Sequence, residues 1–496
     1  MNVSPLSIPT LIRPKLILQA FHLRKARTSI SDAEVIWESL SALAIPLGIP
    51  KLHELSRLTQ HRRERIDRSH RSEHRQDRII PLLADDLNKN ILRFDLPAVP
   101  NSPAITGGIY PLSIHDSYVV DLTCCYEAKI AVAELGRRLN PQGCLLPSQI
   151  KASIGQTLIL FGQPVDWPEN ETEFAQEAEN CAIALLQDAP LAARTQLHES
   201  GRGKFLGGSI FEFESEHPDP TQRYHLVIWL DDNADTAKLE ASGDYYHAML
   251  QLWLSRSKIQ WSAYQSKLAY AEANKLYEFA NLTPLLLDRL QNTTEERLNN
   301  LEGWLLEMQP KTLQYAERIW DIQNQLTTIT INTDNLIDRL NQLKKLSIKN
   351  IDDLTFLEQF SSQDCQTDRK QVAYDLEYVT INKNLFSQRI ETIRGLVEIE
   401  GQRQQIVSDR AERTRDRNTT ILVAMVGSGL AVSGISAQIK PTAAKDALNY
   451  FNITFNEITV PGAIELYIVT IIFHATVGII FAFLIKWIAQ RFSRYS

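Results

Sequence analysis

Cysteine is scarce in this sequence, and the few cysteines follow no functional spacing. They are scattered and odd in number, without the paired spacing of a zinc site or a disulfide framework. We therefore expect reduced, mostly buried thiols at Cys124, Cys125, Cys144, Cys181 and Cys365. The amino-terminal stretch also lacks the continuous apolar segment of a signal peptide, because prolines and charges interrupt it. Both absences favour a cytoplasmic location for the polar body of the chain.

Basic charge is in short supply as well. The 52 Lys and Arg residues against 59 Asp and Glu give a net charge of -7. General nucleic-acid binders usually carry a basic surplus, so we expect no nucleic-acid partner. Neither Gly107-Gly108 nor Gly207-Gly208 has the neighbours of a phosphate loop or a dinucleotide fingerprint. No nucleophile, base and orienting group stand at a recognisable spacing, so we expect that the protein is not an enzyme.

Two long runs without a charged residue lie near the carboxyl terminus. Residues 418–439 and 466–485 are each long enough to cross a bilayer as a helix, which needs about 20 apolar residues. Basic residues gather before the first run and in the tail 486–496, whereas the outer loop 440–465 holds only two lysines. The positive-inside rule then places both termini in the cytoplasm. We expect a multi-pass protein of the cell (inner or plasma) membrane, with the lipid bilayer as a partner.

The region before these runs divides by its sequence pattern. Residues 1–89 form an N-terminal helical and charged segment. Its run 51–78 is typical of a solvated helix. Two alternatives for this run are a metal contact through His70 and His74 and a contact with anionic lipid or nucleic acid.

β-Branched and aromatic residues predict a cytoplasmic α/β domain of about five strands over 90–242. The candidate strands are 91–96, 117–126, 157–161, 204–214 and 224–230, and a helix is expected over 171–189.

Helical periodicity begins at residue 243. We expect a helical bundle over 243–365, in which one helix starts at Pro284 and ends at Pro310. Trp304 and Trp320 stand on the apolar faces of these helices, so both are expected in the core.

The last helix before the uncharged runs carries a heptad seam. Its members recur in alternating steps of four and three, and they are Val372, Leu376, Val379, Lys383, Phe386, Ile390, Ile393 and Val397. An intramolecular bundle and an oligomeric stalk would both give this pattern. We expect a stalk helix over 366–417 that continues from about Asp368 to Ile439. The predicted fold class is therefore an α+β membrane protein, with a cytoplasmic α/β domain, a helical bundle with a long coiled-coil stalk helix, and two C-terminal transmembrane helices.

Two groups of residues are candidates for function. Small residues and one histidine in the uncharged runs either pack helices closely or line a pore; they are Gly427, Ser428, Ala431, Gly434, Ser436 and His474. The second group is Asp231, Asp232 and Asp235, at the end of a predicted strand. Grouped carboxylates there suit Mg²⁺ or Ca²⁺, although the same residues are ordinary in turns.

This layout resembles the CorA family of divalent-metal channels, most closely over residues 386–439. The resemblance implies five copies around a pore, a cytoplasmic domain that gates it, and a divalent cation such as Mg²⁺. The family has Gly-Met-Asn at the outer end of the first span, where this chain has Gly434-Ile435-Ser436. We expect an oligomeric cation channel or transporter gated by its cytoplasmic domain. The alternative is a non-conducting, membrane-anchored sensor or scaffold whose cytoplasmic domain binds a partner.

Overall fold

The computed structural model describes most of the chain up to residue 408. The described residues are 9–24, 30–69, 79–83, 90–98, 104–190, 197–231, 235–289 and 294–408. They group into two compact units. Unit 1 comprises residues 1–269 and 321–375, and unit 2 comprises residues 270–320 and 376–496.

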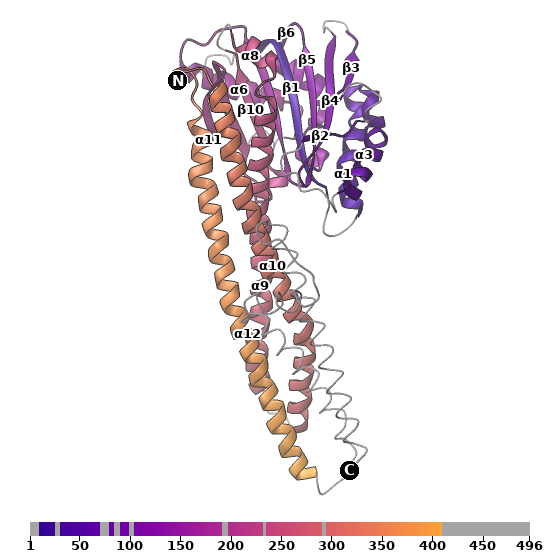
Figure 1. Ribbon diagram of the computed structural model, residues 1–496, viewed down its shortest axis with the longest axis vertical. Coiled ribbons are helices and arrows are strands. Elements are labelled where there is room, and N and C mark those ends of the chain that lie inside the picture. Colours follow the sequence, from indigo (N-terminus) through magenta and orange to yellow (C-terminus); the bar gives the residue numbers. More distant parts are fainter. Residues whose placement is uncertain are drawn as a thin grey trace, which may run out of the picture. The chain divides into compact units, whose positions relative to one another are not determined.

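Unit 1 contains a ten-stranded sheet in the order β2-β4-β5-β1-β7-β10-β9-β8, with β3 also paired to β4 and β6 to β1 (Figure 1). Neighbouring strands are antiparallel except for β7 and β10, which are parallel. The strands are β1 (Thr10–Leu23), β2 (Ile79–Pro81), β3 (Leu92–Leu96), β4 (Ile105–Ile114), β5 (Ser117–Tyr126), β6 (Lys129–Ala131), β7 (Gly155–Pro164), β8 (Leu197–Phe205), β9 (Gly208–Ser215) and β10 (His225–Leu230).

The α-helices belong to unit 1, except that α9, α10 and α12 have residues in both units. The α-helices are α1 (Ile30–Ala42), α2 (Ala44–Leu47), α3 (Leu55–Ser69), α4 (Val132–Leu139), α5 (Pro147–Ile150), α6 (Glu171–Leu185), α8 (Thr236–Ser242), α9 (Tyr246–Arg289), α10 (Thr294–Leu346), α11 (Thr355–Gln359) and α12 (Cys365–Ser408). Short 3₁₀ turns span Pro50–Glu54, Pro141–Gly143 and Pro220–Gln222, and a π-helix spans Phe360–Asp364.

The two faces of the sheet are covered by different helices, because side chains alternate along each strand. On β1, Leu16 and Leu18 belong to the core that includes residues of α1, α4 and α6. Ile17 and Gln19 point to the other face, where they line a small gap with Trp253 of α9. Unit 1 is thus a three-layer structure with the sheet between the two sets of helices.

The helices of unit 2 share one apolar cluster. Phe386, Ile390, Ile393 and Val397 of α12 pack with residues of α9 and α10 such as Ala280 and Trp304. The Tyr315 hydroxyl donates a hydrogen bond to the Val379 carbonyl over 2.9 Å, and its ring stacks on Phe386. These members of the predicted heptad seam therefore pack within the chain, which favours the intramolecular bundle for this part of α12.

The predicted fold class is wrong. The described chain is a mixed α/β structure with one large, mainly antiparallel sheet instead of a five-stranded α/β domain behind a helical segment. No helix among its described residues is both long and apolar enough to cross a membrane. The runs 418–439 and 466–485 lie outside the described residues, as does the predicted continuation of the stalk helix to Ile439.

The central strand of the sheet was missed because of Pro14. Proline cannot donate a ladder hydrogen bond, so it argues against a central strand. In β1 the register shifts between Ile12 and Lys15, and Arg13 adopts a positive φ of 48°. This bulge accommodates the proline, and the strand pairs with β5 and β7 beyond it.

Two prolines and one tryptophan in the helices also differ from expectation. Helix α9 continues past Pro284 to Arg289, and α10 contains Pro310 in its interior. An interior proline costs about 3 kcal/mol, and around Pro310 the burial of Trp304, Leu305 and Met308 opposes that cost. Trp304 is core as predicted, whereas Trp320 is 50% exposed.

Other expectations hold. The strands predicted at 91–96, 117–126, 157–161 and 224–230 are present within a few residues. All five cysteines are free, and four of them are buried. The charged run gives helix α3, although its Arg63 is buried, with its guanidinium 4.7 Å from the ring centre of Trp37.

The predicted strand 204–214 is a hairpin instead. Leu206 and Gly207 form a two-residue turn in which both φ angles are positive (52° and 82°), as a type I′ turn requires. The Asp352 carboxylate accepts hydrogen bonds from the amides of Leu206 (2.8 Å), Gly207 (2.7 Å) and Ile348 (2.8 Å). This single side chain therefore fixes the hairpin to the segment between α10 and α11.

Replacing Asp352 by Ala should lower the free energy of unfolding by about 2–3 kcal/mol, because hydrogen bonds to charged groups contribute about 1.5–3 kcal/mol each and water replaces part of them. Urea unfolding monitored by tryptophan fluorescence measures the loss. Asp338→Ala, at an exposed position of α10, is the control and should stay within about 0.5 kcal/mol of the wild type. Equal effects of the two substitutions would contradict the clamp.

Candidate functional site

Strand β9 carries two buried carboxylates on the face of the sheet that meets α9. Its sequence Phe211-Glu212-Phe213-Glu214 alternates, so the two phenylalanines join the core on one face while the two glutamates point to the other. Only 2% of Glu212 and 9% of Glu214 is exposed. Carboxylates buried to this degree need a partner of opposite charge.

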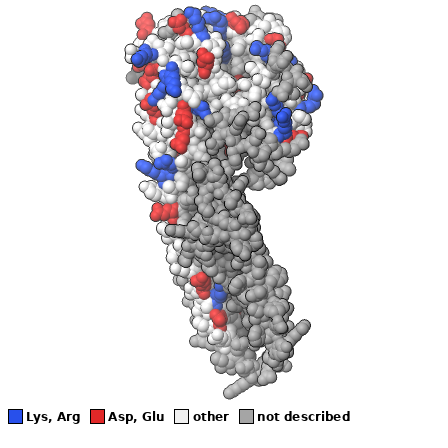
Figure 2. All heavy atoms as spheres, in the orientation of Figure 1, with Lys and Arg blue, Asp and Glu red and all other residues white. Residues whose placement is uncertain are grey.

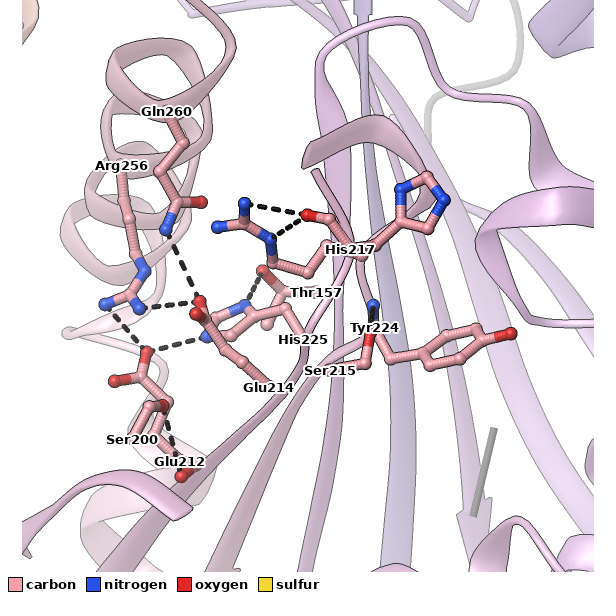
Figure 3. Close-up of polar contacts among 11 residues, drawn as sticks. Thr157, Ser200, Glu212, Glu214, Ser215, His217, Tyr224, His225, Arg256 and Gln260 are labelled. Atoms are coloured by element: carbon pink, nitrogen blue, oxygen red, sulfur yellow. Dashed lines mark hydrogen bonds and ion pairs between the residues drawn. The ribbon is translucent and has the colours of Figure 1, made fainter. Parts of the chain in front are cut away.

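Arg256 of α9 is that partner. Its Nη1 lies 3.0 Å from Glu212 Oε1 and its Nη2 lies 2.7 Å from Glu214 Oε1 (Figure 3). The Phe360 ring lies against the guanidinium, with 4.4 Å between its centroid and Cζ of Arg256. Gln260, one turn further along α9, donates a longer hydrogen bond of 3.4 Å to the same oxygen of Glu214. We call Glu212, Glu214 and Arg256 the ion triad.

Charge pairing holds Glu214 and Arg256 of the triad ionised. Burial raises the pKa of Glu214, but the charges of Arg256 and His225 and the hydrogen bond from Arg256 outweigh it and lower the pKa to about 2. Burial lowers the pKa of Arg256, and the two glutamates raise it by more, so the net shift is upward. Glu214 therefore stays negatively charged and Arg256 positively charged at neutral pH.

His225 extends the triad into the sheet. Its Nε2 lies 2.6 Å from Glu212 Oε1, and its Nδ1 lies 2.8 Å from Thr157 Oγ1. A hydroxyl, an imidazole and a carboxylate in this order can activate a nucleophile. The Thr157 side chain, however, has no exposed surface, and Trp253 packs against the His225 ring with 5.2 Å between their centroids. The chain of hydrogen bonds therefore orders three strands, since no substrate reaches the hydroxyl in this conformation.

A cavity of about 400 Å³ opens beside the triad. Its wall combines residues of β9, of α9, of the loop before β10 and of the segment from α11 to the start of α12. The charged groups of the wall are Glu212, Glu214, Arg223, Arg256, Lys267, Asp364 and Asp368. This volume is in the range of small-molecule sites, which are about 300–1,000 Å³.

Charge on the outer surface is less informative. On the face drawn in Figure 2, acidic and basic side chains lie interspersed over the described residues. Such mixing favours solubility, and it does not indicate a partner that is strongly acidic or strongly basic. The cavity beside the ion triad is therefore the candidate site.

The residues predicted from the sequence are not in this cavity. Asp231 is buried directly after β10, where its amide donates to the Gly162 carbonyl. Asp235 is exposed at the start of α8 and pairs with Lys238 over 3.1 Å. Asp232 lies outside the described residues, so a metal site there stays a prediction; within the described part of the chain no group of three His, Cys, Asp or Glu residues is placed to hold a metal ion.

The pore and helix-packing candidates also stay predictions. Gly427, Ser428, Ala431, Gly434, Ser436 and His474 all lie outside the described residues, as do His70 and His74. The ion triad itself was missed, because Arg256 lies on a helix, 42 residues after Glu214 and 44 after Glu212 of the strand. The signal for it was present in β9, where glutamate alternates with phenylalanine in a segment that is apolar enough to be buried on both faces.

Comparisons with protein-family models, with curated proteins and with solved structures find no match for this chain. The function is therefore inferred from the cavity and its wall.

Arg256→Met should lower the free energy of unfolding by about 3–5 kcal/mol at pH 7, because it leaves two buried carboxylates without a counter-charge. The pKa of Glu214 is depressed in the wild type, so the stabilisation is complete above pH 4.5 and is lost as the pH falls toward 2. Without Arg256, burial raises that pKa, and protonation relieves the penalty. The difference in stability between the two proteins should therefore shrink as the pH falls from 7 to 3.

The control is Arg137→Met, at an ion pair with Glu134 whose side chains are both 51% exposed. This substitution should cost at most about 1 kcal/mol. Urea unfolding at each pH gives both values. A deficit in Arg256→Met that stays constant from pH 7 to pH 3 would show that lost packing on Phe360, and not unpaired charge, is the cause.

Proposed function

We propose that this chain is a small-molecule sensor whose ligand binds in the cavity of unit 1. The observation that carries the proposal is the polar cavity of about 400 Å³ that has the ion triad in its wall. An arginine held between two carboxylates and a phenylalanine ring is rigid, and rigid polar groups at the wall of a cavity provide specificity for a ligand. This proposal specifies the sensor alternative that the sequence left open.

The π-helix in the cavity wall is suited to change its conformation when a ligand binds. Phe360 and Asp364 belong to a π-helix, a rare geometry that occurs mainly as single turns and frequently at functional sites. Helix α12 begins at the next residue, Cys365. A ligand that contacts Asp364 or Asp368 therefore acts on the first turn of a helix of 44 residues.

Helix α9 provides a second connection. Its residues Arg256, Gln260 and Lys267 line the cavity, and the same helix continues to Arg289. Both helices that line the cavity thus have residues in unit 1 and in unit 2. A change in the helix geometry at the cavity is the signal that we propose.

Closing the cavity mouth should abolish ligand binding. Gln363 is exposed and lines the cavity, so Gln363→Trp places an indole in the opening without disturbing a buried side chain. We expect at least one of a panel of small organic cations, anions and zwitterions to raise the melting temperature of the purified full chain, and this shift to disappear in Gln363→Trp. The control Gln342→Trp, at an exposed position of α10, should retain it. An identical shift in both variants would remove the cavity as the binding site.

Cation transport at the cell membrane is the second candidate, on the sequence alone. It is favoured by the uncharged runs 418–439 and 466–485 and by the resemblance to the CorA family. In this proposal the protein is a homo-oligomer in the lipid bilayer, a pentamer if it is CorA-like, and the sensor of unit 1 gates the pore.

This second candidate predicts a cation flux into proteoliposomes that contain the purified protein. A dye sensitive to divalent cations such as Mg²⁺ and a second dye for monovalent cations measure the flux. The mass of the detergent-solubilised particle provides an independent check. A monomeric particle would contradict cation transport. A cation flux that never exceeds the flux into liposomes without protein would contradict it as well, and the sensor function would then remain without a channel.

A further inference from the structure

The charges in the cavity wall do not balance. Two positive side chains are already engaged, since Arg256 pairs with both glutamates of β9 and Arg223 donates from Nε (3.1 Å) and Nη2 (2.9 Å) to the His217 carbonyl. Lys267 is the third cation of the wall, against a total of four carboxylates. The four carboxylates thus exceed the three cations of the wall by one.

The excess negative charge lies at the junction of the π-helix and α12. Asp364 and Asp368 are one helical turn apart there, and both line the cavity. Among the described residues, neither side chain makes an ion pair or a hydrogen bond with another residue. The two carboxylates are therefore available to a ligand in the cavity.

The titration of these two groups agrees with this geometry. Burial raises the pKa of Asp364; Arg256 opposes the shift, and the carboxylates of Glu214 and Glu212 add to it. Burial also raises the pKa of Asp368, with Lys267 opposing the shift and Asp364 adding to it. A positive charge beside Asp364 and Asp368 would relieve the repulsion among these groups.

The wall already accommodates one organic cation of its own. The Arg256 guanidinium lies between the Phe360 ring and two carboxylates, an arrangement that combines cation–π attraction with charge pairing. Tyr264 and Phe356 add aromatic surface to the same wall. A bare metal ion is too small to fill about 400 Å³, whereas an organic cation meets both the carboxylates and the rings.

We propose that the ligand of the cavity is a small organic cation with an ammonium or guanidinium group, which Asp364 and Asp368 bind. This inference rests on the proposed sensor function and names its ligand class. Affinity falls as the pH drops below the raised pKa values of the two aspartates, because their protonation removes the counter-charge.

Isothermal titration of the detergent-purified full chain with agmatine, with 1,4-diaminobutane and with the dianion glutarate tests the ligand class. At least one of the two cations should bind saturably, and the double variant Asp364→Asn/Asp368→Asn should bind it at least 10-fold more weakly. The variant should fold, because burial already disfavours the charged form of both aspartates. Asp334→Asn/Asp338→Asn, at exposed positions of α10, is the matched control and should bind as the wild type does.

The outcomes separate the ligand class from the function. Binding of glutarate alone, when it is lost in Gln363→Trp, would overturn the cation and leave the sensor cavity in place. Cation binding that is unchanged in Asp364→Asn/Asp368→Asn would overturn the assignment to these carboxylates. If none of the three probes binds to the wild type, the assignment of an organic cation is overturned. The melting-temperature panel with Gln363→Trp then tests separately whether the cavity binds any ligand.

Discussion

The pairing of Arg256 with two carboxylates of β9 is the interaction on which the arrangement of unit 1 depends. Each of these ions loses several kcal/mol of hydration on burial, and the loss is compensated only when the pairing geometry is good. Helix α9 must therefore lie at one height and one rotation over the sheet. His225 and Thr157 transmit the same requirement to β10 and β7. Apolar packing alone would permit the helix to slide, because it has no directional preference.

This dependence also relates the cavity to the fold. The wall of the cavity and the contacts that position α9 share Glu212, Glu214 and Arg256. A site built on a strand and a helix is more precisely positioned than one built on loops. The other part of the wall is the segment from Phe356 to Asp368, which comes from a distant part of the chain. The cavity thus combines a rigid side with a side that belongs to the start of α12.

The sequence predicted local patterns well and long-range pairings poorly. Strand β5 was placed at its observed bounds, because β-branched and aromatic residues define it over its full length. Strand β1 was missed because a bulge that tolerates Pro14 leaves no sign in the local pattern. The sequence predicts a strand at Leu206 and Gly207 instead of a turn, because leucine is uncommon at positive φ. The Asp352 carboxylate, which accepts a hydrogen bond from the Leu206 amide, lies 146 residues away. The ion triad could not be assembled from spacing for the same reason.

The contact between β8 and the segment after α10 has a consequence for solubility. Strand β8 is the last strand of the sheet, and its free side would offer unpaired amides and carbonyls to another chain. Lys204 exchanges two backbone hydrogen bonds with Asp353, and Gly201 and Gly203 leave the space in which Phe356 covers the strand. The segment after α10 thereby protects the edge strand β8 from pairing with a strand of another molecule. Any event that detaches this segment would expose an aggregation-prone margin together with the cavity.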